Sequence, residues 1–133
     1  MKKKLISIAL LIVMCSTGFT SYGKDEQPTL IKMHATAYCL DGITASGEPV
    51  RKGICASGHR DWIGKTVIIY QRLPDDSIGR MLWILEVKDT GCKESVIDIW
   101  MPDLDACQEV MNLLYEDGCK GRIYCQVLED CHG

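Results

Sequence analysis

Short apolar runs separated by turn residues most restrict what this chain can fold into. Their β-branched and aromatic residues favour strands, and their lengths fit strands better than helices. The predicted strands occupy residues 31–38, 63–71, 82–88, 96–100 and 121–128.

Only one segment has helical spacing. Apolar residues recur on one face from Leu104 to Tyr115, and Asp103 stands where it can cap the helix N-terminus. The stretch from Leu40 to Arg60 is rich in Gly, Ser, Thr and Pro, which predicts loop or irregular β structure. Five or six short strands with one helix indicate a small, mostly β barrel.

The first 23 residues have the composition of an export signal. Three lysines precede a ten-residue apolar run that is too short to span a bilayer, and Ser21-Tyr22-Gly23 offers small residues for cleavage. We therefore expect a signal peptide over residues 1–23, a lead-in over 24–32 and one domain over 33–133. Cys15 gives an alternative reading, lipid attachment, but the bulky Met14 before it is atypical of a lipoprotein signal. The predicted location is secreted or envelope-associated, with no transmembrane span in the mature chain.

The charge of the mature chain limits its partners. Of the 15 basic residues, three lie in the signal, which leaves 12 against 18 acidic residues and a net charge of −6. An acidic protein lacks the basic footprint of a nucleic-acid binder, so no nucleic-acid partner is expected.

Seven cysteines follow the predicted cleavage point. In an exported chain they indicate disulfides, and three bridges with one unpaired thiol allow 105 arrangements. Zinc is the competing interpretation, because Cys119, Cys125 and Cys131 recur every six residues beside His132. Structural zinc sites usually show a two-to-four-residue gap between paired ligands, and no Cys-x-x-Cys occurs in this chain, so no metal is predicted.

Two aspartates stand in or after apolar strands. Asp89 begins Asp-Thr-Gly at the end of one run, where the ordinary interpretation is turn formation. Asp98 interrupts the next run, and a carboxylate between Ile and Trp neighbours needs a partner, water or a chemical task. Alternation puts Asp98 and Trp100 on one face, which fits a half-open carbohydrate site. Carboxylates on adjacent strands are a familiar layout for acid and base chemistry.

Asp-Thr-Gly also begins the active-site loop of aspartic proteases. A short chain with one copy could form a homodimer whose two aspartates share a proton. That interpretation leaves Asp98 unexplained.

Six ordered blocks together resemble the 3D domain, a family named for three aspartates. They are Ala35–Cys39, Thr44–Gly47, Gly53–Ala56, Ile63–Val67, Val87–Gly91 and Val96–Pro102. The resemblance implies a double-psi β-barrel and a peptidoglycan lytic transglycosylase that cuts the β-1,4 bond between N-acetylmuramic acid and N-acetylglucosamine. It implies that Asp98 acts as general acid and then base with Asp89 in support, without metal or cofactor. Candidate contacts to the glycan strand are Tyr38, Thr44, Ser46 and Trp100.

The family's first aspartate has no clear counterpart here. Ser57-Gly58-His59-Arg60 follows Ala56, and Asp61 stands too far along the chain. Two functions therefore stay open: a lytic enzyme, and a non-catalytic, disulfide-stabilised barrel that binds a glycan or a protein.

Overall fold

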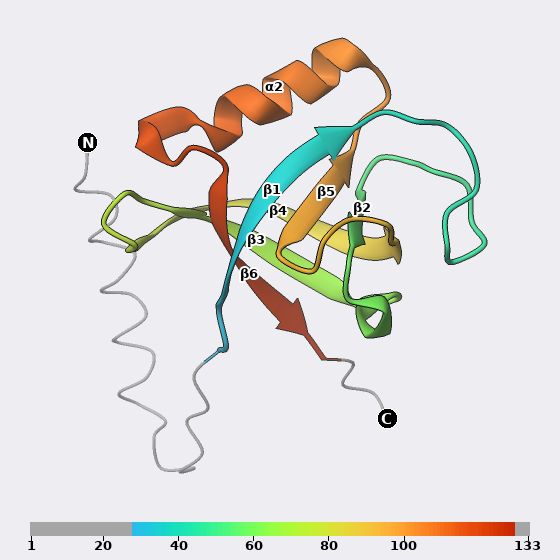
Figure 1. Cartoon of the computed structure of the whole chain (residues 1–133), viewed down its shortest axis with the longest axis horizontal. Coiled ribbons are helices and arrows are strands. Elements are labelled where there is room, and N and C mark those ends of the chain that lie inside the picture. Colours follow the sequence, from blue (N-terminus) through green and yellow to red (C-terminus); the bar gives the residue numbers. More distant parts are fainter. Residues whose placement is uncertain (1–27, 130–133) are drawn as a thin grey trace.

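The computed structural model describes residues 28–129, so the predicted signal peptide, Cys15, Cys131 and His132 lie outside it. Six strands close into one barrel in the order β1-β5-β2-β4-β3-β6, and the helix α2 lies across one end (Figure 1). The strands are β1 (Ile31–Tyr38), β2 (Ile54–Ser57), β3 (Thr66–Arg72), β4 (Ile78–Asp89), β5 (Val96–Trp100) and β6 (Arg122–Leu128). The mostly-β barrel with one helix is confirmed.

The strand order has an internal two-fold relation. Exchanging β1 with β4, β2 with β5 and β3 with β6 returns the same closed order. The two parallel pairs, β1–β5 and β2–β4, exchange under this operation, and all other pairs are antiparallel. Each half of the chain therefore supplies strands that lie between strands of the other half, as in a double-psi barrel.

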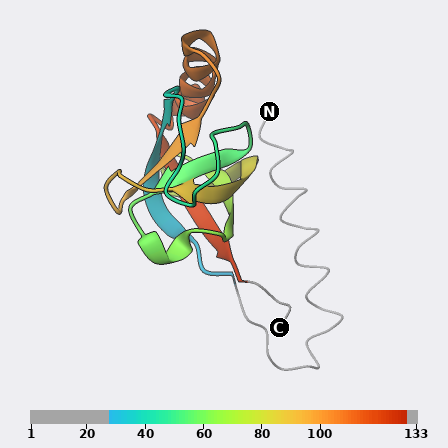
Figure 2. The same ribbon diagram turned by 90° about the vertical axis from the view of Figure 1, so that its right-hand side faces the viewer.

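The helix α2 runs over Leu104–Leu114, as its apolar spacing predicts. The Asp103 side chain accepts a hydrogen bond from the Ala106 amide at 2.8 Å, which caps the first turn. Its buried residues Cys107, Val110 and Leu114 face the barrel, where α2 packs against β1. A short 3-10 turn, η3 (Glu116–Gly118), then leads into β6, and the side view shows the helix beyond the barrel end (Figure 2).

Two elements differ from the sequence prediction. The strand β2 lies inside the segment expected to be loop or irregular β structure, and it was not placed as a strand because its four residues, all buried, are too few to show alternation. The strand β4 begins at Ile78, earlier than its apolar run, because the turn at Leu73–Ser77 forms a hairpin that continues the pairing with β3. A second 3-10 turn, η2 (Arg60–Trp62), connects β2 to β3.

The predicted disulfides are not present among the described residues. All six cysteines there are free thiols. Cys55 and Cys125 are fully buried in the barrel interior and pack as small apolar side chains, and burial raises the pKa of the Cys125 thiol to about 12. The Cys107 thiol lies within hydrogen-bonding reach of Cys39, the residue after β1.

No helix within residues 28–129 has the length and apolar character needed to cross a membrane.

Candidate functional site

A β-bulge sets the direction of Asp89. Between β2 and β4, Cys55 lies opposite Val87, but the next residue, Ala56, lies opposite Asp89, so that Lys88 is passed over. Val87 is fully buried in the barrel interior, and strict alternation would therefore turn Asp89 inward as well. The extra residue turns the carboxylate to the outside instead, the effect a bulge has beside many active sites.

Asp98 reaches the same outer face by ordinary alternation. Its neighbours Ile97 and Ile99 are fully buried in the core, so Asp98 points outward from the middle of β5. Across the parallel pairing it lies beside Thr36 of β1, whose hydroxyl donates a 2.8 Å hydrogen bond to Asp98 Oδ1.

The strand β2 lies between the two aspartates. Ala56 is the register partner of Asp89 on one side and of Asp98 on the other. The expectation that the carboxylates stand on adjacent strands is therefore wrong for the barrel, although β4 and β5 are consecutive in the chain. At a usual strand spacing of about 4.8 Å, two steps put the aspartate backbones roughly 10 Å apart. Ala56 carries only a methyl group, so no long side chain separates the carboxylates.

Three donors hold the Asp89 carboxylate. Oδ1 accepts the amides of Ala45 and Thr90, each at 2.9 Å, and Oδ2 accepts the Tyr38 hydroxyl at 3.3 Å. Ala45 belongs to the long β1–β2 connection, which extends to one side of the barrel (Figure 1). Asp89 thus ties that connection and β1 to the end of β4, and its oxygens are fixed in direction.

Asp98 is half-buried, and within residues 28–129 it accepts a single hydrogen bond, from Thr36. Burial raises the pKa of Asp98, the Thr36 hydrogen bond opposes that rise, and the charge of Asp89 adds to it. The result is one anchored carboxylate beside one carboxyl that holds its proton more tightly than usual. A carboxyl whose pKa is raised, next to a carboxylate that is held by hydrogen bonds, is an arrangement typical of acid and base pairs.

Tyr38 and Cys92 lie around the pair. Burial and the charges of both aspartates raise the pKa of the Tyr38 phenol, so Tyr38 stays protonated as a donor to Asp89. Burial and the Asp98 charge raise the pKa of Cys92, which donates to the Val96 carbonyl at 3.5 Å. A thiol held in its neutral form is a poor nucleophile, so these contacts give Cys92 no catalytic role.

The four candidate glycan contacts have different surroundings. Tyr38 lies at the pair, as described. Thr44 is only 5% exposed and bonds to Ser46 Oγ and the Glu48 carbonyl, each at 2.8 Å. Trp100 is 7% exposed, and its indole N–H donates to the Leu40 carbonyl at 2.8 Å. Thr44 and Trp100 therefore support the β1–β2 connection, and Ser46, half-buried, holds Thr44.

Thr36 is the site residue absent from the sequence prediction. The sequence could have indicated Thr36, because it stands two residues before Tyr38 and so lies on the same face of the strand. The register that puts it beside Asp98 is a long-range pairing.

The position of Gly58, after β2, has no room for a side chain. A Cβ at Gly58 would lie 2.5 to 2.6 Å from backbone atoms of Cys92, Lys93 and Glu94. The turn after β2 packs directly on the β4–β5 connection and leaves no room for a side chain there. Asp61 is exposed in η2 and lines another cavity, with Trp62 and Lys65.

Within residues 28–129, no group of three or more His, Cys, Asp or Glu side chains is arranged to hold a metal ion.

Comparison with known proteins finds no matching family model, no matching curated protein and no matching solved structure.

Proposed function

We propose that this chain is an exported, cell-wall-active protein that cleaves peptidoglycan glycan strands as a lytic transglycosylase. The observation that supports it best is the unequal pair: Asp98 with its raised pKa beside the firmly held Asp89. The ordered blocks that resemble the 3D domain give the pair its reaction and its substrate.

One carboxyl can perform both proton transfers of that reaction. Protonated Asp98 donates to the glycosidic oxygen as the bond breaks, and the resulting carboxylate then removes a proton from the 6-hydroxyl of the same muramic acid residue. That hydroxyl closes a 1,6-anhydro ring, so the substrate supplies its own nucleophile. A second nucleophilic carboxylate, as retaining glycosidases use, is unnecessary.

Asp89 has a supporting role in this scheme. Its three donors keep it in place, and its negative charge favours the protonated form of Asp98 before the reaction. Because Asp89 does not contact the transferred proton, we describe it as a positioning residue.

The second candidate is a barrel that binds a glycan or a protein without cleaving it. The close packing at Gly58 favours this reading, because it removes one of the three aspartates for which the family is named.

One experiment distinguishes the lytic enzyme from the binding barrel. The purified mature protein and its Asp98→Asn variant are each incubated with peptidoglycan, and the soluble products are analysed by mass spectrometry. Anhydro-muropeptides are one water lighter than the products of hydrolysis. Their release by the native protein, and not by the variant, supports the lytic function. If neither protein releases them and both sediment with the glycan, the enzymatic proposal fails.

A further inference from the structure

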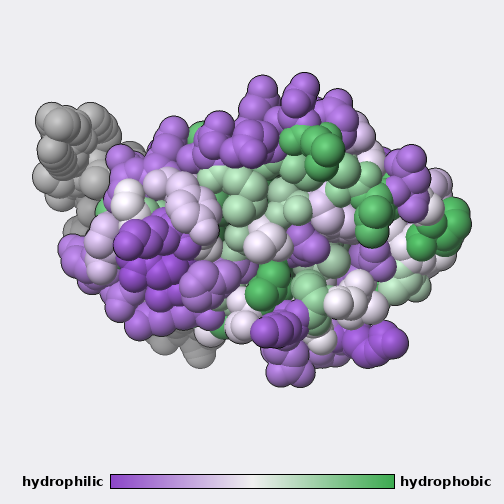
Figure 3. Space-filling model, turned by 45° about the horizontal axis from the view of Figure 1, so that its top comes forward, coloured by the Kyte–Doolittle hydropathy of each residue, from purple (hydrophilic) through white to green (hydrophobic). Residues whose placement is uncertain are grey.

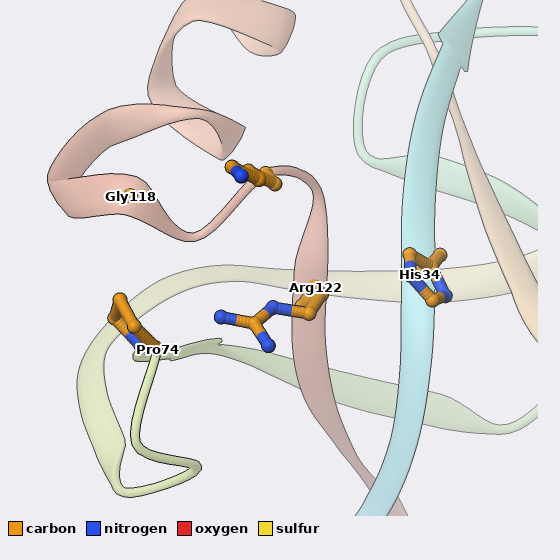
Figure 4. A pocket seen from close by; sticks show the side chains of 5 residues that line it. His34, Pro74, Gly118 and Arg122 are labelled. Carbon is orange, nitrogen blue, oxygen red and sulfur yellow. The ribbon is translucent and has the colours of Figure 1, made fainter.

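A second polar feature lies on the barrel surface, apart from the two aspartates. An open cavity of about 610 Å³ is lined by His34 of β1, Pro74 of the β3–β4 turn, Gly118 of η3, Lys120 and Arg122 (Figure 4). A Cβ at Gly118 would lie 3.2 Å from Pro74 Cγ, so glycine at this position keeps the cavity from narrowing. In Figure 3 this face is hydrophilic on the left, the side where the β3–β4 turn and η3 lie in Figure 1.

The cations of this cavity are unneutralised within residues 28–129. Neither Lys120 nor Arg122 forms an ion pair there. Arg122 uses Nε to donate to the Cys119 carbonyl at 3.1 Å, which orients the guanidinium and leaves its terminal N–H groups available. Figure 4 shows this guanidinium extending from β6 toward Pro74.

Carboxylates on the neighbouring elements are engaged elsewhere. Glu116 pairs with Arg80 at 2.8 Å, and Asp117 accepts from the Gln71 amide at 3.2 Å. Asp76 pairs with Lys32 and Arg72. In a chain with more acidic than basic residues, a cavity with two unpaired cations and an exposed imidazole fits an anionic ligand.

The cavity adjoins the aspartate site along one strand. The outer face of β1 carries every second residue, which are His34, Thr36 and Tyr38. Thr36 donates a hydrogen bond to Asp98, and Tyr38 donates one to Asp89. Two residues along a strand span about 7 Å, so the His34 imidazole lies about that far along β1 from Thr36, which contacts Asp98. A single ligand can therefore contact both places.

We propose that the cavity of His34, Lys120 and Arg122 is a subsite for a carboxylate carried by a substituent of the glycan, next to the sugar at Asp98. This inference rests on the proposed function and names the part of the substrate that it would select. Carboxylates of this kind are the free lactyl group of muramic acid and the free carboxyl groups of a peptide attached to it. The cavity would then favour glycan strands whose carboxyl groups are free over strands in which they are amides.

The test compares the binding of three soluble fragments by isothermal titration calorimetry. One is a muropeptide disaccharide with free carboxyl groups, the second is the same fragment with its carboxyl groups converted to amides, and the third is the peptide-free disaccharide with its lactyl carboxylate. We expect at least about tenfold tighter binding of the free-acid muropeptide than of its amide, the size of one charge-assisted hydrogen bond. In the muropeptide the lactyl carboxyl is bonded to the peptide, so the comparison of acid with amide tests the peptide carboxyl groups, and the third fragment tests the lactyl carboxylate. A preference for the free-acid muropeptide assigns the peptide as the source, and tighter binding of the third fragment than of both muropeptides assigns the lactyl group.

The principal variant is Lys120→Asn. Lys120 has a φ of 55°, which Asn tolerates, and its side chain is exposed, so the fold is expected to survive. We expect Lys120→Asn to lose most of the preference for the acid. Arg122→Lys keeps the positive charge and should retain part of the preference for the free-acid fragment. The control is Arg51→Gln, which removes an exposed cation in the β1–β2 connection that pairs with Glu86 and should leave the preference unchanged.

Two outcomes separate this inference from the lytic function. If the native protein releases anhydro products but binds all three fragments equally, the subsite is overturned and the lytic function stands. If it releases none but still prefers the acid fragment in a Lys120-dependent way, the lytic function fails and the carboxylate site is supported.

Discussion

The two aspartates of the site are held in opposite ways. Asp89, at the end of β4, accepts three hydrogen bonds and ties the β1–β2 connection to the barrel. Asp98, in the middle of β5, accepts one bond from Thr36 and is half-buried on the outer face. Asp89 is therefore fixed at both of its oxygens, whereas within residues 28–129 Asp98 is held at Oδ1 alone.

The largest expected effect follows from removing each carboxyl in turn. Asp98→Asn should lower the rate of anhydro-product release by about a hundredfold to ten-thousandfold, the usual contribution of a general acid or base. Asp89→Asn should lower it by only about tenfold to a hundredfold, because the amide oxygen still accepts from Ala45 and Thr90. Initial rates on the same glycan substrate measure both, and equal losses would contradict the unequal roles.

Gly58 gives the next largest effect, on stability. Gly58→Ala places a methyl group against the backbone at 92–94 and should cost about 1 to 3 kcal/mol of unfolding free energy, as overpacking does. Urea denaturation measures it. Gly91→Ala is an informative companion, because Gly91 has a φ of 114° and open space around its Cβ position, so its cost would come from backbone strain alone. A neutral Gly58→Ala variant would contradict the close packing described at this position.

A smaller effect concerns the pH dependence of lysis. The proposed reaction requires protonated Asp98, so its rate is expected to fall as pH rises through the pKa of that group. Thr36→Val removes the hydrogen bond that lowers this pKa, and the alkaline limb should move to higher pH. Asp89→Asn removes a charge that raises it, and the limb should move to lower pH. Complete pH–rate profiles measure the shifts, and shifts in the same direction for the two variants would show that Asp98 is not the titrating acid.

The smallest effect is a pH-dependent gain in stability. Because the pKa of Asp98 is raised in the folded state, its contribution is fully present below the unfolded pKa and is lost as pH rises through the folded pKa. Asp98→Asn is neutral at every pH and should stabilise the protein near neutral pH, by less than about 2 kcal/mol. The gain should vanish below about pH 3.9, the ordinary pKa of an aspartate. Thermal unfolding at both pH values measures it, and a gain of equal size at both would point to packing instead.

Local patterns predicted most of the elements. β-branched runs located β1, β3 and β5, and the spacing after Asp103 located α2. The segment of β2 was predicted only as loop or irregular β structure, because four buried residues have no detectable period. Its position between the strands of the two aspartates was therefore not predicted. Asp98 could be identified as unusual from its neighbours alone, whereas the bulge at Lys88 and the Thr36 contact depend on pairings between distant segments.

The interleaved strand order has a consequence for how the protein reaches its native state. A cut in the Leu73–Ser77 turn would yield two three-strand pieces, and each would lack the parallel partner that only the other can provide. No half of the barrel can serve as a finished nucleus, and pairings so far apart in the chain make for slow, concerted folding. The two aspartates belong to β4 and β5, which are joined through β2, so their site exists only when strands from both halves of the barrel are in place.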